Sequence, residues 1–95
     1  MSSYRASTIE AALEKKGFEK SNSHHKIYIF MVDGRKTSVH TRVSHGIDVY
    51  GDSLLGPMAK QMKLSKRQLA DFIECPMSLE QYAEHLLTNQ HIRKA

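Results

Sequence analysis

The residues of this chain best suited to chemistry are histidines, and two of them are adjacent. His24-His25 follows the polar stretch Ser21-Asn22-Ser23 and precedes Lys26 at the start of an apolar segment. An imidazole with a pKa near 6.5 exchanges protons at cellular pH, so it could take the proton of a ribose 2′-hydroxyl and start RNA cleavage without a metal. The alternative is a pair of solvent-exposed loop histidines. The six histidines are His24, His25, His40, His45, His85 and His91.

Other reactive groups are sparse. Four histidines, at 24, 25, 40 and 45, could converge on zinc or copper, but neither cysteine nor carboxylate stands at a recognised ligand spacing beside them. We therefore expect no metal and no cofactor. Cys75 precedes Pro76 and has no basic activator nearby, which is typical of a semi-buried structural thiol. The glycines are too scattered to form a phosphate-binding loop.

Length and composition indicate one globular domain spanning 1–95. Hydrophobic residues make up 40% and charged residues 25% of the 95 residues, which is ordinary for a folded domain. The longest apolar run, Ile27–Val32, is too short to cross a bilayer, and the N-terminal residues do not resemble a secretory signal. A single cysteine cannot form an internal disulfide. We expect a cytoplasmic protein that makes no membrane contact.

Charge is distributed unevenly along the chain, whose net charge is +4. Between Lys15 and Arg67 there are eleven basic and four acidic residues, whereas 68–92 holds four acids and no Lys or Arg. A basic body of this kind suits a polyanion, because Lys and Arg that neutralise phosphates release counterions. The alternative is an ordinary solvated surface with unequal charge.

Apolar spacing predicts a helix followed by three strands. Ser7-Thr8-Ile9-Glu10 has the pattern of a capping box and opens a helix over about 8–16, which Gly17 ends. Phe18–Ser21 is a short strand, and the run 25–32 is a central strand that leads into the hairpin signal Asp33-Gly34. Thr37–Val43 alternates strictly, which predicts an antiparallel sheet with one covered face and one wet face.

Three further helices are predicted after the strands. The segment 54–62 is amphipathic, and Pro57 is either its first residue or a point where the helix bends. Capping boxes at Ser65–Gln68 and Ser78–Gln81 open two more helices, through Ile73 and through Leu87. The order is α-β-β-β-α plus a C-terminal two-helix extension, which is an α+β fold with helices gathered on one face of a three-stranded antiparallel sheet.

The stretch from Ile9 to Leu64 resembles the HicA (YcfA-like) toxin family of bacteria and archaea. The matching features are Leu13–Phe18 at the helix end, the Ser23-His24-His25 turn, Asp33-Gly34-Arg35, and His45-Gly46 leading into an amphipathic helix. The resemblance implies a double-stranded-RNA-binding-domain-like (dsRBD-like) core over 7–64, extended by 65–95. It also implies an mRNA ribonuclease of a type II toxin–antitoxin system, with one catalytic histidine and a HicB-type antitoxin that covers it. Either His25 or His24 matches the catalytic position, with His25 slightly preferred. The glycine usual before Ser-His is absent.

Our hypothesis places RNA across the exposed sheet face and the helix ends. The residues expected to contact RNA are Lys26, Arg35, Lys36 and Arg42, with Lys60, Lys63 and Arg67 farther out. Two other functions remain open: a non-catalytic RNA-binding module on the same fold, and a protein-interaction domain whose basic face meets an acidic partner. The extension could lengthen the core, form a homodimer surface or act as a lid over the site.

Overall fold

The chain forms an α+β fold in the computed structural model, which describes residues 3–22, 26–44, 46–74 and 76–92. A helix is followed by a three-stranded antiparallel sheet and then by three more helices. In chain order the elements are β1 (Tyr4–Arg5), α1 (Ala6–Lys15), β2 (Phe18–Asn22), β3 (Lys26–Val32), β4 (Arg35–Val43), β5 (Val49–Tyr50), α2 (Asp52–Gln61), α3 (Lys66–Glu74) and α4 (Leu79–Thr88).

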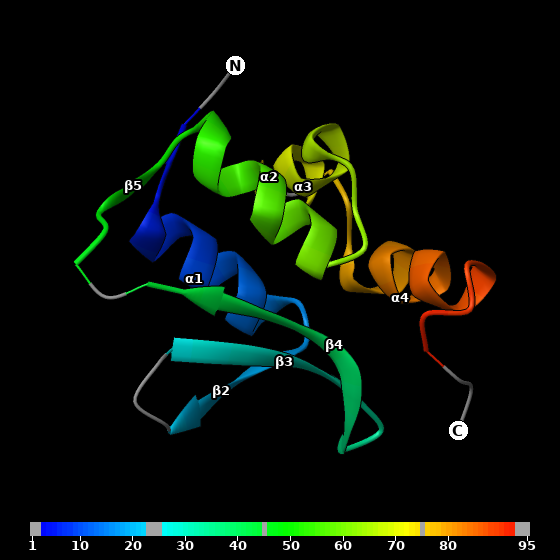
Figure 1. Cartoon of the computed structure of the whole chain (residues 1–95). Helices are drawn as coiled ribbons and strands as arrows, with labels where there is room; N and C mark the ends of the chain where they lie inside the picture. Colours follow the sequence, from blue (N-terminus) through cyan, green and yellow to red (C-terminus); the bar gives the residue numbers. More distant parts are fainter. Residues whose placement is uncertain (1–2, 23–25, 45, 75, 93–95) are drawn as a thin grey trace.

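The main sheet has the order β2-β3-β4, with β3 in the centre as predicted. Its buried face consists of apolar side chains such as Tyr28, Phe30 and Val39, while Ser38, His40 and Arg42 are exposed on the other face. The four helices lie on the buried side (Figure 1). The predicted alternation of β4 is confirmed. A second sheet, in which β1 pairs with β5 in antiparallel register, was not predicted because each strand has only two residues.

The β3–β4 hairpin turns at Asp33 and Gly34, whose φ angles of 51° and 77° agree with the predicted tight turn. The register then shifts, since Met31 pairs with Lys36 but Ile29 pairs with His40. The Thr37 hydroxyl bridges this irregularity: it donates to the Phe30 carbonyl at 2.8 Å and accepts the Val39 N–H at 3.2 Å. A side chain thus satisfies backbone groups near the point where the ladder is interrupted.

The start of α1 corrects one prediction. The helix begins at Ala6 rather than at about residue 8, and its N-cap, Arg5, makes no side-chain cap, so no capping box forms at Ser7. The Ala6 N–H is instead bound by the Asp48 carbonyl at 2.8 Å, next to the β1–β5 pair. Backbone of the segment just before β5 therefore satisfies this free helix amide.

Of the later helices, α3 and α4 begin as predicted, whereas α2 begins two residues before the predicted segment 54–62. α2 begins at Asp52 with Pro57 inside it, so Pro57 is not the first helical residue. Reciprocal bonds of 2.8 and 3.1 Å between Ser65 and Gln68, and of 2.9 and 3.1 Å between Ser78 and Gln81, confirm both predicted capping boxes. The described helices include none long and apolar enough to span a membrane.

One core joins the sheet to the C-terminal helices. Phe18 of β2 and Phe30 of β3 pack with Phe72 of α3 and Tyr82 of α4, with ring centroids 5.0–6.0 Å apart. The Tyr82 hydroxyl also donates to the Met62 carbonyl at 2.8 Å, which ties α4 to the end of α2. Residues 65–92 therefore complete the core of the sheet.

At Gly17, α4 and the main sheet approach each other closely. Its φ of 91° is the left-handed conformation predicted for the residue after α1. A Cβ at this position would lie 2.8 Å from a Leu79 methyl carbon and 3.1 Å from the Phe30 ring. Both the backbone conformation and the approach of α4 to the sheet require glycine here.

Candidate functional site

The predicted catalytic histidines, His24 and His25, lie outside the described residues, as do His45 and Cys75. The described residues next to them in sequence meet at one end of the sheet. Lys26, the first residue of β3, pairs with Val43, the last residue of β4, and Ser44 follows directly. The site is therefore built from the groups around this end of the sheet.

A polar groove of about 490 Å³ opens at this end. It lies between the start of α1, the start of β3 and the segment from β4 to β5. Its polar lining includes Arg5, Ser7, Glu10, Lys26, Ser44 and Asp48. Two cations, two carboxylates and two hydroxyls thus surround a space large enough for part of a polar, charged ligand.

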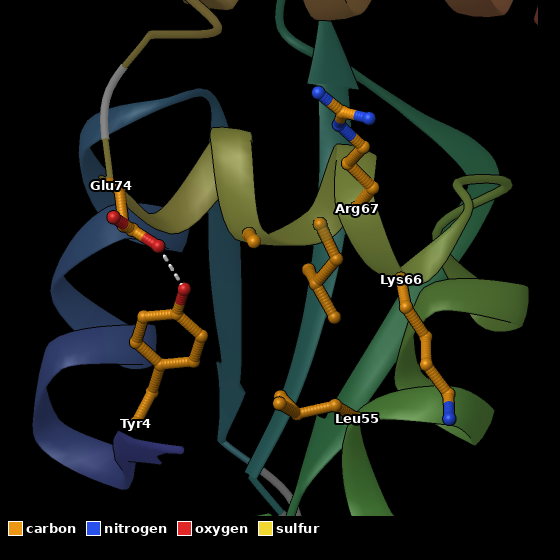
Figure 2. Close-up of a pocket in the computed structure, with 7 residues that line it drawn as sticks. Tyr4, Leu55, Lys66, Arg67 and Glu74 are labelled. Atoms are coloured by element: carbon orange, nitrogen blue, oxygen red, sulfur yellow. Dashed lines mark hydrogen bonds between the residues drawn. The ribbon is translucent and has the colours of Figure 1, made fainter. Parts of the chain in front are cut away.

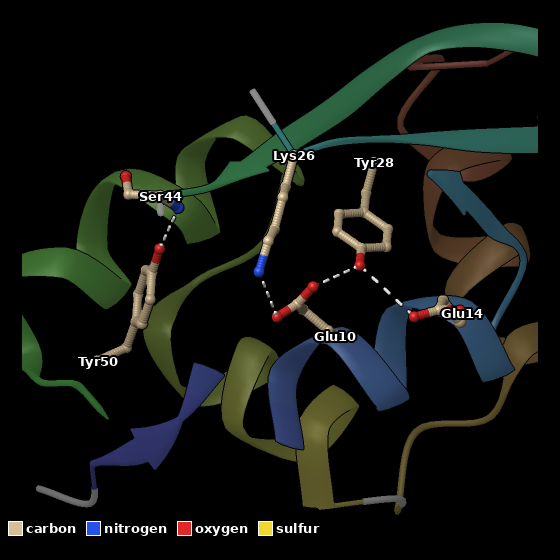
Figure 3. A network of polar contacts seen from close by, with 6 residues as sticks. All are labelled: Glu10, Glu14, Lys26, Tyr28, Ser44 and Tyr50. Carbon is tan, nitrogen blue, oxygen red and sulfur yellow. Dashed lines mark hydrogen bonds and ion pairs between the residues drawn. The ribbon is translucent and has the colours of Figure 1, made fainter. Parts of the chain in front are cut away.

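Inside the groove, Glu10 of α1 connects two side chains of β3 (Figure 3). Its Oε1 accepts a hydrogen bond from the Tyr28 hydroxyl at 2.7 Å, and its Oε2 lies 3.5 Å from Lys26 Nζ. The Tyr28 hydroxyl also lies 3.5 Å from Glu14 Oε2. Burial, followed by the hydrogen bond to Glu10, raises the pKa of the Tyr28 phenol, so the phenol stays protonated and orients the carboxylate.

The lysine of this network keeps access to solvent. The Lys26 side chain is 28% exposed and that of Glu10 is 17% exposed. A contact of 3.5 Å at this exposure is a weak ion pair, because water screens it and both side chains lose freedom in making it. An anion that enters the groove can therefore compete with Glu10 for the ammonium group.

A second tyrosine fixes the far wall of the groove. The Ser44 N–H donates to the Tyr50 hydroxyl at 2.8 Å, and the Tyr50 side chain is buried against the core (Figure 3). This bond holds the end of β4 beside the start of α1, where Asp48 already binds the Ala6 N–H.

The seven cations predicted to contact RNA do not share one surface. Lys26 lies on the helix side of the sheet, whereas Lys36 and Arg42 are exposed on the opposite face and Arg35 is exposed next to the hairpin. Lys60 and Lys63 are exposed at the end of α2, and the Lys63 carbonyl lies 2.7 Å from His85 Nε2. Lys26 and Arg42 lie on opposite faces of the sheet, because Lys26 pairs with Val43, whose side chain is buried on the helix side.

Arg67 lies beside a second, apolar pocket of about 460 Å³ between β1, α2 and α3. Leu55, Leu69 and Ala70 line it, and the Tyr4 hydroxyl donates to Glu74 along one side (Figure 2). Lys66 is also at this pocket and pairs with Asp52 at 3.6 Å. This pocket is much less polar than the groove at the sheet end.

Of the six polar groove residues, sequence reasoning named only Lys26 as a site residue, and it also counted one buried cation as part of the basic surface. Arg5 was not singled out, and Glu10 was interpreted only as a capping residue, although its four-residue spacing from Glu14 signals two carboxylates on one helix face. Lys16, counted in the basic body, is only 4% exposed: its ammonium donates to the Phe72 carbonyl and lies 4.9 Å from the centre of the Phe72 ring.

The remaining described histidines lie apart from the groove lining. His40 is exposed on the open sheet face, and His85 contacts the turn after α2. Within the ranges that the structure describes, no three His, Cys, Asp or Glu residues come together as a metal site. Comparisons of the chain with protein-family models, curated proteins and solved structures find no match.

Proposed function

We propose that this protein is a HicA-type endoribonuclease that cleaves mRNA at the polar groove, with His25 or His24 as its general acid–base. The observation that carries the proposal is the position of Lys26. This residue directly follows His25 in the sequence, and its ammonium group lines a groove with Arg5 and two hydroxyl side chains. A proton-transfer group next to cations is what cleavage of a phosphodiester by its own 2′-hydroxyl needs.

In the proposed reaction the histidine removes the proton of the ribose 2′-hydroxyl. The 2′-oxygen attacks phosphorus, the bond from phosphorus to the 5′-oxygen breaks, and the imidazolium returns a proton to that leaving oxygen. The product ends are a 2′,3′-cyclic phosphate and a 5′-hydroxyl. Lys26 and Arg5 stabilise the charge that develops on the phosphoryl oxygens. No metal or cofactor takes part in this scheme.

The order α1-β2-β3-β4-α2, with both helices on one side of the sheet, supports a dsRBD-like interpretation of the core. RNA seated in the groove contacts the helix side of this core. It does not reach Lys36 or Arg42 at the same time unless it wraps around a sheet edge, so we assign the principal phosphate contacts to the groove. We also propose that a HicB-type antitoxin covers the groove. The protein then acts in the cytoplasm, where mRNA is found.

The second candidate function is RNA binding without cleavage. Glu10 and Asp48 favour it over cleavage, because two carboxylates in the groove lining repel a phosphate that would be cleaved there, while Lys60 and Lys63 are exposed outside the groove and can bind RNA. This function predicts salt-sensitive RNA binding that survives the loss of both histidines.

Induced expression separates the two functions. We expect wild-type protein to arrest growth and shorten transcripts, and His24→Ala/His25→Ala to do neither while still binding RNA. His91→Ala, on a half-buried histidine near the end of the chain, is the matched control and should behave as wild type. If wild-type protein and the double variant both leave growth and transcripts unchanged, the nuclease proposal fails.

A further inference from the structure

The face of the main sheet opposite the helices carries an apolar row. Ile27, Ile29 and Met31 of β3 point to this side, since the alternate residues Tyr28 and Phe30 are buried beneath the helices. All three are partly exposed, and none belongs to the core cluster or packs against it. No described helix lies on this side of the sheet (Figure 1).

Basic and imidazole side chains border this row along β4. Arg42 pairs with Ile27, His40 with Ile29 and Lys36 with Met31, and all three β4 residues are exposed. On the β2 side, Ile29 is paired with Glu19 and Ile27 with Ser21. We call this surface, made by Ile27, Ile29, Met31, Lys36, His40 and Arg42, the open sheet face.

The side chains of the open sheet face argue against RNA as its ligand. Single-stranded RNA binds to sheets by stacking its bases on aromatic rings, and duplex RNA is held by phosphate and 2′-hydroxyl contacts. The central row here is aliphatic and thioether, so bases have no ring to stack on along the middle of the face and meet only His40 and Arg42 at its border. An apolar centre with a charged rim is instead the usual construction of a protein interface.

Charge argues against a second copy of this chain. Two open sheet faces that met would bring Lys36 and Arg42 of each copy into one interface, with Glu19 as the acid on the β2 side of the row. Like charges at an interface cost free energy and suppress the wrong pairing. The surface complementary to this face is apolar in the centre and acidic along one edge.

We propose that the open sheet face binds a partner protein that presents an apolar row flanked by Asp and Glu side chains. The apolar row packs on Ile27, Ile29 and Met31, while the acids meet Lys36 and Arg42. This inference goes beyond the proposed ribonuclease, because the face is on the opposite side of the sheet from the groove. A partner bound there leaves Lys26 and the groove uncovered.

Site-specific photo-crosslinking in the organism that encodes the chain tests this proposal. A benzophenone amino acid replaces Ser38, which is exposed between Lys36 and His40, and a matched control places it at Ser53, exposed on α2. We expect one protein to crosslink from position 38 and not from 53. That protein, purified, should bind the full chain with an affinity that falls about tenfold or more in Lys36→Glu/Arg42→Glu and in Ile29→Ser.

Two further measurements make the result decisive. Reversal of the partner's acids to Lys should restore binding to Lys36→Glu/Arg42→Glu, and circular dichroism should show that each variant is folded. Several results would overturn the proposal: a crosslink from position 38 to RNA or to a second copy of the chain, no crosslink above the Ser53 control, or a crosslinked protein whose affinity the variants leave unchanged.

Discussion

The Tyr28 hydroxyl donates a 2.7 Å hydrogen bond to Glu10 Oε1 and so joins the central strand to the first helix. The same carboxylate lies 3.5 Å from Lys26 through its other oxygen. A core tyrosine thus sets the position of the charged groups in the groove. We expect Tyr28→Phe to lower the free energy of unfolding by about 1–2 kcal/mol, because a hydrogen bond to a carboxylate is lost. Urea denaturation measures this change.

Glu14→Gln is the control for that variant. Its carboxylate lies 3.5 Å from the same hydroxyl and is exposed, so its replacement should change stability by less than about 0.5 kcal/mol. Equal losses in the two variants would mean that Tyr28 is not anchored mainly by Glu10.

Alkaline pH should destabilise the fold through two tyrosines. Burial raises the pKa of Tyr82, and burial with the Glu10 hydrogen bond raises that of Tyr28. A phenol whose folded pKa lies above its unfolded value of about 10 contributes full stability below that pH and loses it as pH rises. The free energy of unfolding should therefore fall above about pH 10.

Urea titrations between pH 8.5 and 11 measure this slope. Tyr82→Phe removes one of the two phenols. The unfolding free energy of this variant should fall less steeply with pH, by up to the slope that release of one proton on unfolding gives, whatever its value at pH 8.5. An unchanged slope in Tyr82→Phe would show that this phenol ionises equally readily in the folded and unfolded states.

Thr37 should contribute more to the free energy of unfolding than its place in an edge strand suggests. Thr37→Val removes the hydroxyl that serves the Phe30 carbonyl and the Val39 N–H, and we expect a loss of about 1–3 kcal/mol. Ser38→Ala, next in the chain but exposed, should stay within about 0.5 kcal/mol. Chemical denaturation of both variants provides the comparison, and a Thr37→Val protein as stable as wild type would contradict it.

Residues 65–92 should be indispensable for folding. A chain that ends at Leu64 loses Phe72 and Tyr82 from the aromatic cluster and leaves Phe18 and Phe30 uncovered, so we expect it to lack cooperative unfolding. Within the full chain, Phe72→Ala should cost about 3–5 kcal/mol. Circular dichroism and one-dimensional NMR test both forms. A truncated chain with dispersed amide signals would show that the two helices are a separate addition.

The sequence predicted the strand order well because its signals were local. Strict alternation from Thr37 to Val43 and the Asp33-Gly34 turn each determine structure within a few residues, as do the two capping boxes that formed. The start of α1 could not be predicted in this way. Its first amide is satisfied by Asp48, more than forty residues away, and no pattern around Ser7 reveals that contact.

The face of the sheet on which Lys26 lies could not be predicted from the sequence for a different reason. Ile27 and Ile29 are as apolar as Tyr28 and Phe30, so the alternation within β3 does not show which set faces the helices. Only the packing of Tyr28 against α1 decides it, and this puts Lys26 beside Glu10. Lys16 is similar, because its burial depends on α3, which the chain forms fifty residues later.

Cleavage by purified protein tests the central claim most directly. Full-length chain is incubated with 5′-labelled mRNA in excess EDTA, beside His25→Ala, His24→Ala and His91→Ala. We predict fragments ending in 2′,3′-cyclic phosphate from wild type and His91→Ala, with a loss of about 10²-fold or more in rate in one of the two adjacent histidine variants. Intact RNA with wild-type protein would contradict the account. Cleavage at the wild-type rate by His24→Ala, by His25→Ala and by the double variant would also contradict it.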